Sequence, residues 1–398
     1  GLMDIERLRR DFPILQDIIY LDSASTSLTP EPVLQSVQQY YRGYKANVGR
    51  GVYRTAQMAD QRYRDAHGKV ADFIGGGEEG LTVFTRNATE SINIISRGLN
   101  WRMGDRIVTT LLEHHSNLLP WIRQKQLGAD LKIVKPDRDG LLDLSHLDSA
   151  IKKKTRMVAV SQVSNALGTV LPIKEIGEIC RDRGAALLVD GAQSVPHMPL
   201  NVEDLHCDFL CFSGHKMLSP MGAGVLWMRT EEGVEPLLVG GGMVEDADVD
   251  GYVAKKGYEG YEAGTPDISA AIGLGRALDY LADVGMEEIH RHEQILALRL
   301  VEGLQEIKGV VVYGPSPGRG RQSGVVSFSV EGLLPHEVAM MLDQAAGICV
   351  RSGHHCCIPL MKHLGLKHGT VRASIYLYNI EAEIDKLLAT VEQIARMA

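Results

Sequence analysis

The sequence predicts an α/β protein with a mostly parallel, seven-stranded sheet in a large domain and a smaller α+β domain. Two observations support this prediction. Apolar, β-rich runs alternate with helical patterns from about residue 81 to residue 230, and the texture changes after about residue 270. We therefore place the large domain at residues 20–267 and the small domain at residues 1–19 and 268–398.

Seven short runs are the candidate strands of the large domain. Several are nearly continuously hydrophobic, as strands covered on both faces of a sheet must be. They lie at residues 81–85, 106–110, 131–134, 157–163, 186–190, 209–213 and 224–228. Helical patterns fit between them, for example at residues 87–97 and 173–183. A parallel sheet of this kind binds ligands at the carboxyl ends of its strands.

The small domain is predicted from a different order of elements. A long helical stretch at residues 268–307 leads to strands near 310–313 and 323–330. A helix at 335–346, a cysteine-bearing segment, a strand at 370–374 and a final helix follow. We expect the helical start at residues 5–11 to pack on this domain.

Bulk composition excludes several classes of function. A net charge of −8 and a pI near 6.0 argue against a nucleic-acid or anionic membrane surface. No apolar run approaches the roughly 20 residues that span a bilayer, and the first residues lack the apolar core of a signal peptide. The six cysteines are scattered, which favours reduced thiols in a cytoplasmic protein over a disulfide framework.

Lys216 is the first candidate for chemistry. It lies just beyond the strand at 209–213, and burying a lone ammonium is so costly that it must be paired, neutral or covalently used. Asp190 ends another buried strand, where a carboxylate suits a cationic partner such as a protonated pyridine nitrogen. Taken singly, each has an ordinary alternative: a surface lysine in a polar turn, and a strand-end or helix-capping aspartate.

A phosphate-binding site is indicated nearby. Thr85-Arg-Asn-Ala-Thr89-Glu-Ser joins a strand to a helix, and a helix N-terminus offers free N–H groups and a positive dipole end. Ser213 and His215, which flank the lysine turn, could complete the phosphate site. The alternative for Thr89 and Glu90 is simple helix-start chemistry.

An ordered set of motifs resembles the class V aminotransferase family and, within it, the SufS-type (group II) cysteine desulfurases. The resemblance runs from about residue 5 to the C-terminus. It implies the fold-type-I architecture of pyridoxal-phosphate (PLP) enzymes and a homodimer with sites at the interface. The motifs are Tyr20-Leu-Asp-Ser-Ala-Ser, Arg86-Asn-Ala-Thr-Glu, Glu113-His-His-Ser-Asn, Val163-Ser-Asn165-Ala-Leu-Gly, Asp190-Gly-Ala-Gln, Ser213-Gly-His-Lys, Glu262-Ala-Gly-Thr-Pro and Arg351-Ser-Gly-His-His-Cys.

The resemblance implies a role for each site residue. Lys216 would hold the cofactor as a Schiff base, Asp190 would pair with the pyridinium nitrogen, and His114 would stack on the ring. Gln193 would hydrogen-bond the ring hydroxyl. The phosphate would be held by Thr89, Ser213 and His215, with Thr265 reaching in from the second subunit. Asn165 and Arg372 would bind the substrate carboxylate, for which the planar guanidinium is well suited.

Cys356 decides between the activities of this family. An aminotransferase needs no cysteine here, whereas a desulfurase needs a thiolate above the substrate sulfur. Arg351, His354 and His355 place cationic or potentially cationic groups around it, which favours thiolate. The alternative is a buried, inert cysteine. We therefore expect conversion of L-cysteine to L-alanine, with a Cys356 persulfide that passes its sulfur to an acceptor protein for iron–sulfur cluster assembly or a related pathway.

Two residues depart from the family pattern. Ala88 stands where many relatives carry a second threonine, so one phosphate hydrogen bond is missing. Cys357 stands where alanine is more usual, and it is either a packing residue or a resolving thiol. A metal site is not expected at His354-His-Cys-Cys357, because four consecutive residues can hardly converge on one ion.

The sequence also fits other functions. The same motifs fit a selenocysteine lyase that acts on L-selenocysteine, another aminotransferase or a kynureninase-like lyase. A further alternative is not an enzyme in practice: a scaffold that docks sulfur-acceptor or cluster-assembly proteins and has little turnover of its own.

Overall fold

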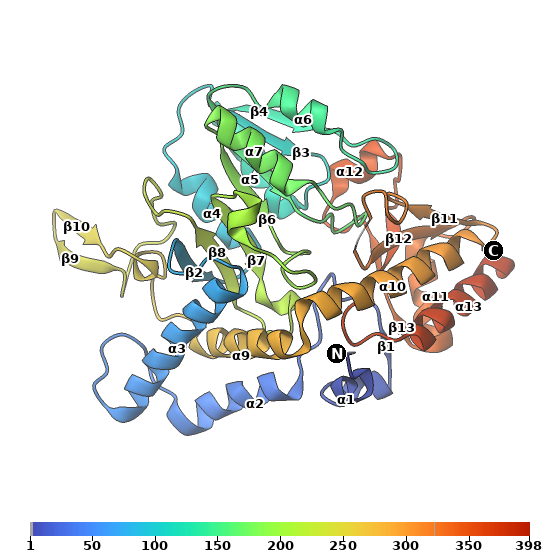
Figure 1. Cartoon of the computed structure of the whole chain (residues 1–398), viewed down its shortest axis with the longest axis horizontal. Helices are drawn as coiled ribbons and strands as arrows, with labels where there is room; N and C mark the ends of the chain where they lie inside the picture. Colours follow the sequence, from blue (N-terminus) through green and yellow to red (C-terminus); the bar gives the residue numbers. More distant parts are fainter. Residues whose placement is uncertain (1–2, 322) are drawn as a thin grey trace.

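The computed structural model describes residues 3–321 and 323–398 (Figure 1). Its centre is a seven-stranded sheet with the strand order β2-β8-β7-β6-β5-β3-β4. The strands are β2 (Leu81–Thr85), β3 (Arg106–Thr110), β4 (Asp130–Val134), β5 (Thr155–Ser161), β6 (Ala186–Asp190), β7 (Phe209–Ser213) and β8 (Gly224–Met228). The predicted sheet is thus confirmed. Five strands match the prediction residue for residue, and β4 and β5 start one or two residues earlier.

The sheet is parallel apart from β8, which runs antiparallel to both of its neighbours, β2 and β7. Alternate residues of each strand face opposite helical layers, because successive side chains in a strand point to opposite faces. In β6, Leu187 and Val189 share a core with residues of α3 (Arg54–Phe73), α6 (Leu144–Ala150) and α7 (Ile173–Arg183). Leu188 packs with α4 (Ala88–Gly98) and α5 (Leu119–Gln126) on the other face.

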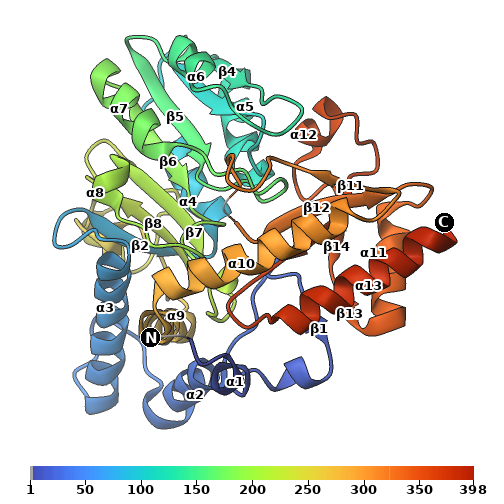
Figure 2. The same cartoon turned by 45° about the vertical axis from the view of Figure 1, so that its right-hand side comes forward.

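A second core lies around an antiparallel sheet with the order β11-β12-β15-β14. Helices α10, α11 and α13 cover this sheet, and Figure 2 shows α10 running toward it from the large sheet. The elements are β11 (Val310–Tyr313), β12 (Val325–Val330), β14 (Arg351–Gly353), β15 (Thr370–Ser374), α10 (Met286–Gln305), α11 (Pro335–Ala346) and α13 (Glu381–Met397).

The predicted helical stretch at residues 268–307 is two helices. Gly285 separates α9 (Ile268–Val284) from α10, and its φ of 95° lies in the region that favours glycine. Leu274 and Leu278 of α9 belong to the core of the large sheet, whereas Leu296 and Leu300 of α10 belong to the second core. The domain boundary at residue 267 stays a prediction.

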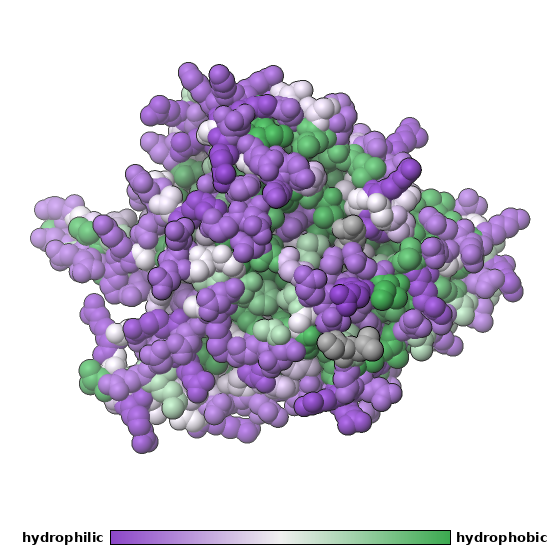
Figure 3. All heavy atoms as spheres, in the orientation of Figure 1, coloured by the Kyte–Doolittle hydropathy of each residue, from purple (hydrophilic) through white to green (hydrophobic). Residues whose placement is uncertain are grey.

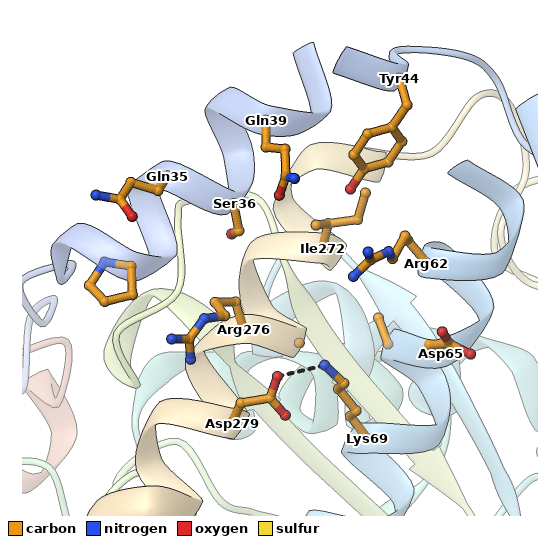
Figure 4. A pocket seen from close by; sticks show the side chains of 13 residues that line it. Gln35, Ser36, Gln39, Tyr44, Arg62, Asp65, Lys69, Ile272, Arg276 and Asp279 are labelled. Carbon is orange, nitrogen blue, oxygen red and sulfur yellow. Dashed lines mark hydrogen bonds and ion pairs between the residues drawn. The ribbon is translucent and has the colours of Figure 1, made fainter. Parts of the chain in front are cut away.

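Helix α9 packs against α2 (Glu31–Gln39) and α3. The Lys69 amine of α3 pairs with the Asp279 carboxylate of α9 at 2.6 Å, in a groove between the three helices (Figure 4). Arg9 of the N-terminal helix α1 (Ile5–Arg9) donates hydrogen bonds to the Tyr378 carbonyl and the Glu383 carboxylate, whereas Leu8 of the same helix belongs to the core of the large sheet. Within residues 3–321 and 323–398, no helix combines the length and the apolarity needed to cross a membrane.

A hairpin of β9 (Val244–Asp248) and β10 (Gly251–Ala254) projects from the body, at the left of Figure 1. In Figure 3 the same projection shows hydrophobic atoms on a largely hydrophilic surface. Val249 is 94% exposed, and Tyr252 and Val253 are also exposed.

Gly224 of β8 provides a test of the packing between the sheet and the start of α4. A Cβ at this position would lie 2.5 Å from the backbone N and Cα of Asn87, which can move only with the helix. We expect Gly224→Ala to destabilise the protein by about 1–3 kcal/mol, as overpacking does. Thermal unfolding followed by circular dichroism measures this. Gly68→Ala is the control, because nothing lies within 4 Å of its added Cβ in α3. Equal melting temperatures for the two variants would contradict the packing argument.

Candidate active site

A cavity of about 230 Å³ lies at the carboxyl ends of β5, β6 and β7. It brings together all the predicted site residues except Cys356 and Thr265. The lining residues are Ala24, Ser25, Asn87, Ala88, Thr89, His114, Ser116, Ser161, Val163, Asn165, Asp190, Ala192, Gln193, Ser213, His215, Lys216, Arg351 and Arg372.

Asp190 and Lys216 are an oppositely charged pair in this cavity. Asp190 is the last residue of β6, and its Oδ1 accepts a hydrogen bond from the Ala192 amide at 3.0 Å. Lys216 ends the short 3-10 turn that follows β7. Burial raises the pKa of Asp190, and the positive charge of Lys216 opposes that shift. Burial lowers the pKa of Lys216 to about 8, so the amine is mostly protonated at neutral pH but loses its proton far more readily than an ordinary lysine.

His114 is held as a neutral imidazole. Its Nδ1 accepts a hydrogen bond from the Ser116 amide at 3.0 Å, which leaves the proton on Nε2. Burial and the nearby charge of Lys216 lower the pKa of His114 to about 3. The ring therefore lines the cavity as a flat, uncharged group with one N–H donor.

A group of donors gathers at the start of α4. The Ala88 amide donates to Ser213 Oγ at 2.9 Å, and the Glu90 amide donates to Asn87 Oδ1 at 3.0 Å. In the described part of the chain, the Thr89 amide between them has no hydrogen-bond acceptor, so it is available to an anion. The Thr89 hydroxyl contacts Ser116 Oγ at 2.6 Å.

His215 joins the same end of the cavity. Its Nδ1 lies 3.1 Å from the Thr26 hydroxyl, and burial lowers its pKa to about 4. The ring is therefore neutral at ordinary pH. It can offer a hydrogen bond to an anion, but no charge.

Arg372 is buried on β15 and faces the same cavity. Its guanidinium donates to the Asn165 carbonyl at 2.9 Å and to Ser25 Oγ at 3.0 Å. Its Nε has no hydrogen-bond partner among the described residues. Burial lowers the pKa of Arg372 only to about 10, so the side chain stays charged and can still bind a carboxylate.

Cys356 follows β14 and is partly exposed. The nearest cation is Arg351, which also lines the cavity and whose guanidinium lies 3.7 Å from Cys356 Sγ. Of the two histidines expected around the thiol, His354 bonds the Lys367 carbonyl at 2.8 Å, and His355 is buried against the Thr370 hydroxyl at 2.8 Å. Burial lowers the pKa of His355 to about 2, so it supplies no positive charge.

Thr265 does not line this cavity. Its hydroxyl accepts a hydrogen bond from Asn47 at 3.3 Å, and it lines a separate hollow together with Arg64 and Tyr258. The protomer by itself therefore does not bring Thr265 to the start of α4.

Among the cavity residues that were not assigned from the sequence, two serines each connect two other side chains of the site. Ser25 accepts hydrogen bonds from both Arg372 and Arg351, and Ser116 bonds both Thr89 and His114. Both belong to motifs that indicated the family. The sequence therefore located these two serines but did not predict their hydrogen bonds. Within the described ranges, no three His, Cys, Asp or Glu side chains are grouped to hold a metal ion.

Known proteins match this chain over nearly its whole length. A probable cysteine desulfurase of Methanothermobacter thermautotrophicus is 45% identical over 400 residues, which cover 99% of each chain. A probable cysteine desulfurase of Pyrococcus abyssi is 44% identical over 98% of each chain. Among solved structures, the apo cysteine desulfurase of Thermococcus onnurineus superposes with a TM-score of 0.95 at 45% identity, covering 100% of this chain and 99% of that one.

A more distant structure agrees. The cysteine desulfurase CsdA of Escherichia coli has a TM-score of 0.91 at 33% identity over 100% of both chains. The profile of the aminotransferase class-V family matches residues 19–387. The chain therefore belongs to the aminotransferase class-V family, with the fold and the PLP dependence of that family.

Proposed function

We propose that this protein is a PLP-dependent cysteine desulfurase that converts L-cysteine to L-alanine and carries the released sulfur as a persulfide on Cys356. One observation carries the proposal: the Cys356 thiol lies against Arg351, which lines the same cavity as Lys216 and Asp190. The relatives named cysteine desulfurase support it.

The residues of the cavity fit the cofactor. Gln193 donates to the Ala24 carbonyl at 3.0 Å, which leaves its buried Oε1 without a partner and able to accept a hydrogen bond from a ring hydroxyl. Asp190 offers a carboxylate to a pyridinium nitrogen, and the Thr89 amide and hydroxyl offer donors to a phosphate. When bound, PLP supplies an electron-withdrawing ring that stabilises negative charge at the substrate α-carbon.

Lys216 would serve two purposes through one amine. Uncharged, it can hold the cofactor aldehyde covalently, and once released by substrate it can accept the proton from the α-carbon. A lysine with a pKa of about 8 is suited to both steps, because it both gains and loses a proton near neutral pH. His114, neutral and fixed by Ser116, would keep the ring in place by stacking.

Arg372 and Asn165 would orient the substrate. Both side chains line the cavity, and the guanidinium of Arg372 and the amide of Asn165 would donate to the carboxylate of L-cysteine. The β-sulfur can then be presented to Cys356. L-Selenocysteine differs at that one atom, so the same groups would bind it too.

Cys356 would take the sulfur by direct attack. Its thiolate, stabilised by the positive charge of Arg351, forms a bond to the substrate sulfur. The bond between that sulfur and the β-carbon breaks, and its electron pair stays with carbon, which is protonated to the methyl group of alanine. Cys356 is partly exposed, so a thiol of a sulfur-acceptor protein could reach its persulfide.

A homodimer would complete the site. Thr265 lies outside the cavity of its own protomer, and the projecting hairpin exposes apolar side chains. We propose that Thr265 of one protomer donates to the cofactor phosphate held by its partner.

Replacing the nucleophile separates cofactor binding from sulfur transfer. Cys356→Ser should retain PLP, because Cys356 does not line the cavity, but sulfide release from L-cysteine should fall by on the order of 100-fold or more. Methylene-blue assay of sulfide, with alanine as the second product, measures this. Cys349→Ser is the control, since Cys349 is also partly exposed but lies on β13 (Ile348–Cys349). Parent-like turnover in Cys356→Ser would rule out this nucleophile.

The pKa of Lys216 predicts the pH dependence of cofactor uptake. The amine must lose its proton before it adds to an aldehyde, so uptake by the apoprotein should accelerate as pH rises and level off above about 8, not near the ordinary value of 10.5. Stopped-flow absorbance at several pH values follows this reaction. Lys216→Ala should form no covalent adduct at any pH. A rate that keeps rising beyond about pH 10 would show that burial does not lower this pKa.

Mixed dimers test the contribution of Thr265. Thr265→Ala should weaken PLP binding by about tenfold, as loss of a hydrogen bond to a charged group does. Mixing it with Lys216→Ala chains should restore parent-like affinity in one site per mixed dimer, because the intact Lys216 and the intact Thr265 then serve the same site. Equilibrium dialysis against PLP measures the affinities. If Thr265→Ala alone binds like the parent, or if mixing restores nothing, the shared site is wrong.

A further inference from the structure

The side-chain amide of Asn165 forms hydrogen bonds to the residues on both sides of Cys356. Its Nδ2 donates to the His355 carbonyl at 2.7 Å, and its Oδ1 accepts a hydrogen bond from the Cys357 thiol at 3.2 Å. The nucleophile therefore lies between two residues that are bound to one amide group.

The backbone at this place needs such support. His355 and Cys356 both have φ near 55°, in the left-handed region, and neither is a glycine. Non-glycine residues adopt this region at a cost, and two in succession hold it only where the surroundings impose it. The His115 amide adds a further hold by donating to the Cys356 carbonyl at 2.7 Å.

Only one orientation of the Asn165 amide satisfies these contacts. The His355 carbonyl can only accept, so it requires Nδ2, and the protonated Cys357 thiol can donate to Oδ1. Cys357 is fully buried, and burial raises its pKa to about 12, so the thiol keeps its proton. If the amide were reversed, its oxygen would face the carbonyl oxygen of His355.

Asn165 also connects this segment to the proposed carboxylate site. Its backbone carbonyl accepts a hydrogen bond from the Arg372 guanidinium at 2.9 Å, and its side chain lines the cavity. The position of Asn165 therefore fixes two things together: the backbone that carries the nucleophile and the arginine that faces the substrate.

We propose that Cys357 is a positioning residue whose S–H group orients the Asn165 amide and so holds Cys356 in register with the substrate carboxylate site. The proposal rests on the proposed role of Cys356 as the nucleophile. It assigns Cys357 no sulfur chemistry, because the side chain is enclosed between Asn165 Oδ1 and the Glu113 carbonyl, 3.7 Å away.

Two substitutions separate the hydrogen bond from the packing. Cys357→Ala removes the donor, whereas Cys357→Ser keeps a donor in nearly the same place. Cys180→Ala is the matched control, because it removes an equally buried thiol from α7, far along the chain from the site. All three variants are prepared as holoenzyme.

The first measurement does not depend on turnover. Hydrogen–deuterium exchange of the peptide that spans residues 354–358 should be about threefold to tenfold faster in Cys357→Ala, since a net hydrogen bond of ordinary strength is lost. Cys357→Ser should lie nearer the parent, and Cys180→Ala should match the parent. Equal exchange in Cys357→Ala and the parent would overturn the proposal, whatever the enzyme does with L-cysteine.

The second measurement is kinetic. In Cys357→Ala, kcat for L-cysteine should fall by about threefold to fivefold because Cys356 is held less firmly, and KM should rise because Asn165 also positions Arg372. Cys357→Ser should recover most of this loss. A serine variant as impaired as the alanine variant would overturn the hydrogen-bond role. Mass spectrometry after incubation with L-cysteine would also overturn this role if it found the added persulfide sulfur on Cys357. If the parent protein showed no added sulfur on Cys356, that result would instead contradict the proposed function.

Discussion

The site depends on two opposite charges placed in one buried cavity. Asp190 and Lys216 follow neighbouring parallel strands, β6 and β7, so the sheet itself delivers them to the same edge. Each alone would be costly to bury, and the charge of each favours the ionised form of the other. In the proposed function, a cofactor with a cationic ring nitrogen and an aldehyde would satisfy both groups, because the carboxylate would pair with the ring nitrogen and the amine would bond to the aldehyde.

The smaller sheet adds what the large sheet cannot supply. Strands β14 and β15 are antiparallel neighbours, and Arg351 pairs directly with Arg372 in their register. Two arginines side by side would repel, and both are directed to Ser25, a residue from the N-terminal segment. Three distant parts of the chain thus meet at one hydroxyl. This arrangement would let the Arg372 guanidinium bind the proposed substrate while the Arg351 guanidinium contacts the thiol of Cys356.

Much of the fold and of the site was predictable from the sequence, for identifiable reasons. Continuous apolar runs mark the buried strands, so five of seven strands have the predicted bounds, and motif order located the cavity residues. The break at Gly285 was missed because helical periodicity continues across it. The bond between Cys357 and Asn165 was beyond reach, since it joins residues 192 apart through side-chain orientations that no local pattern encodes. Thr265 stays a prediction because its proposed site lies on a second chain.

The histidines illustrate why residue type alone misjudges electrostatics. From the sequence, His354 and His355 were expected to place positive charge near the thiol. In the structure, burial beside Arg372 and Arg351 keeps His355 uncharged. His114 is also neutral, first because it is buried and then because Lys216 and the arginines place positive charge near it. A cavity that contains permanent cations suppresses protonation of any imidazole placed among them. Arg351, whose guanidinium lies 3.7 Å from Cys356 Sγ, is therefore the cation placed to stabilise a thiolate there.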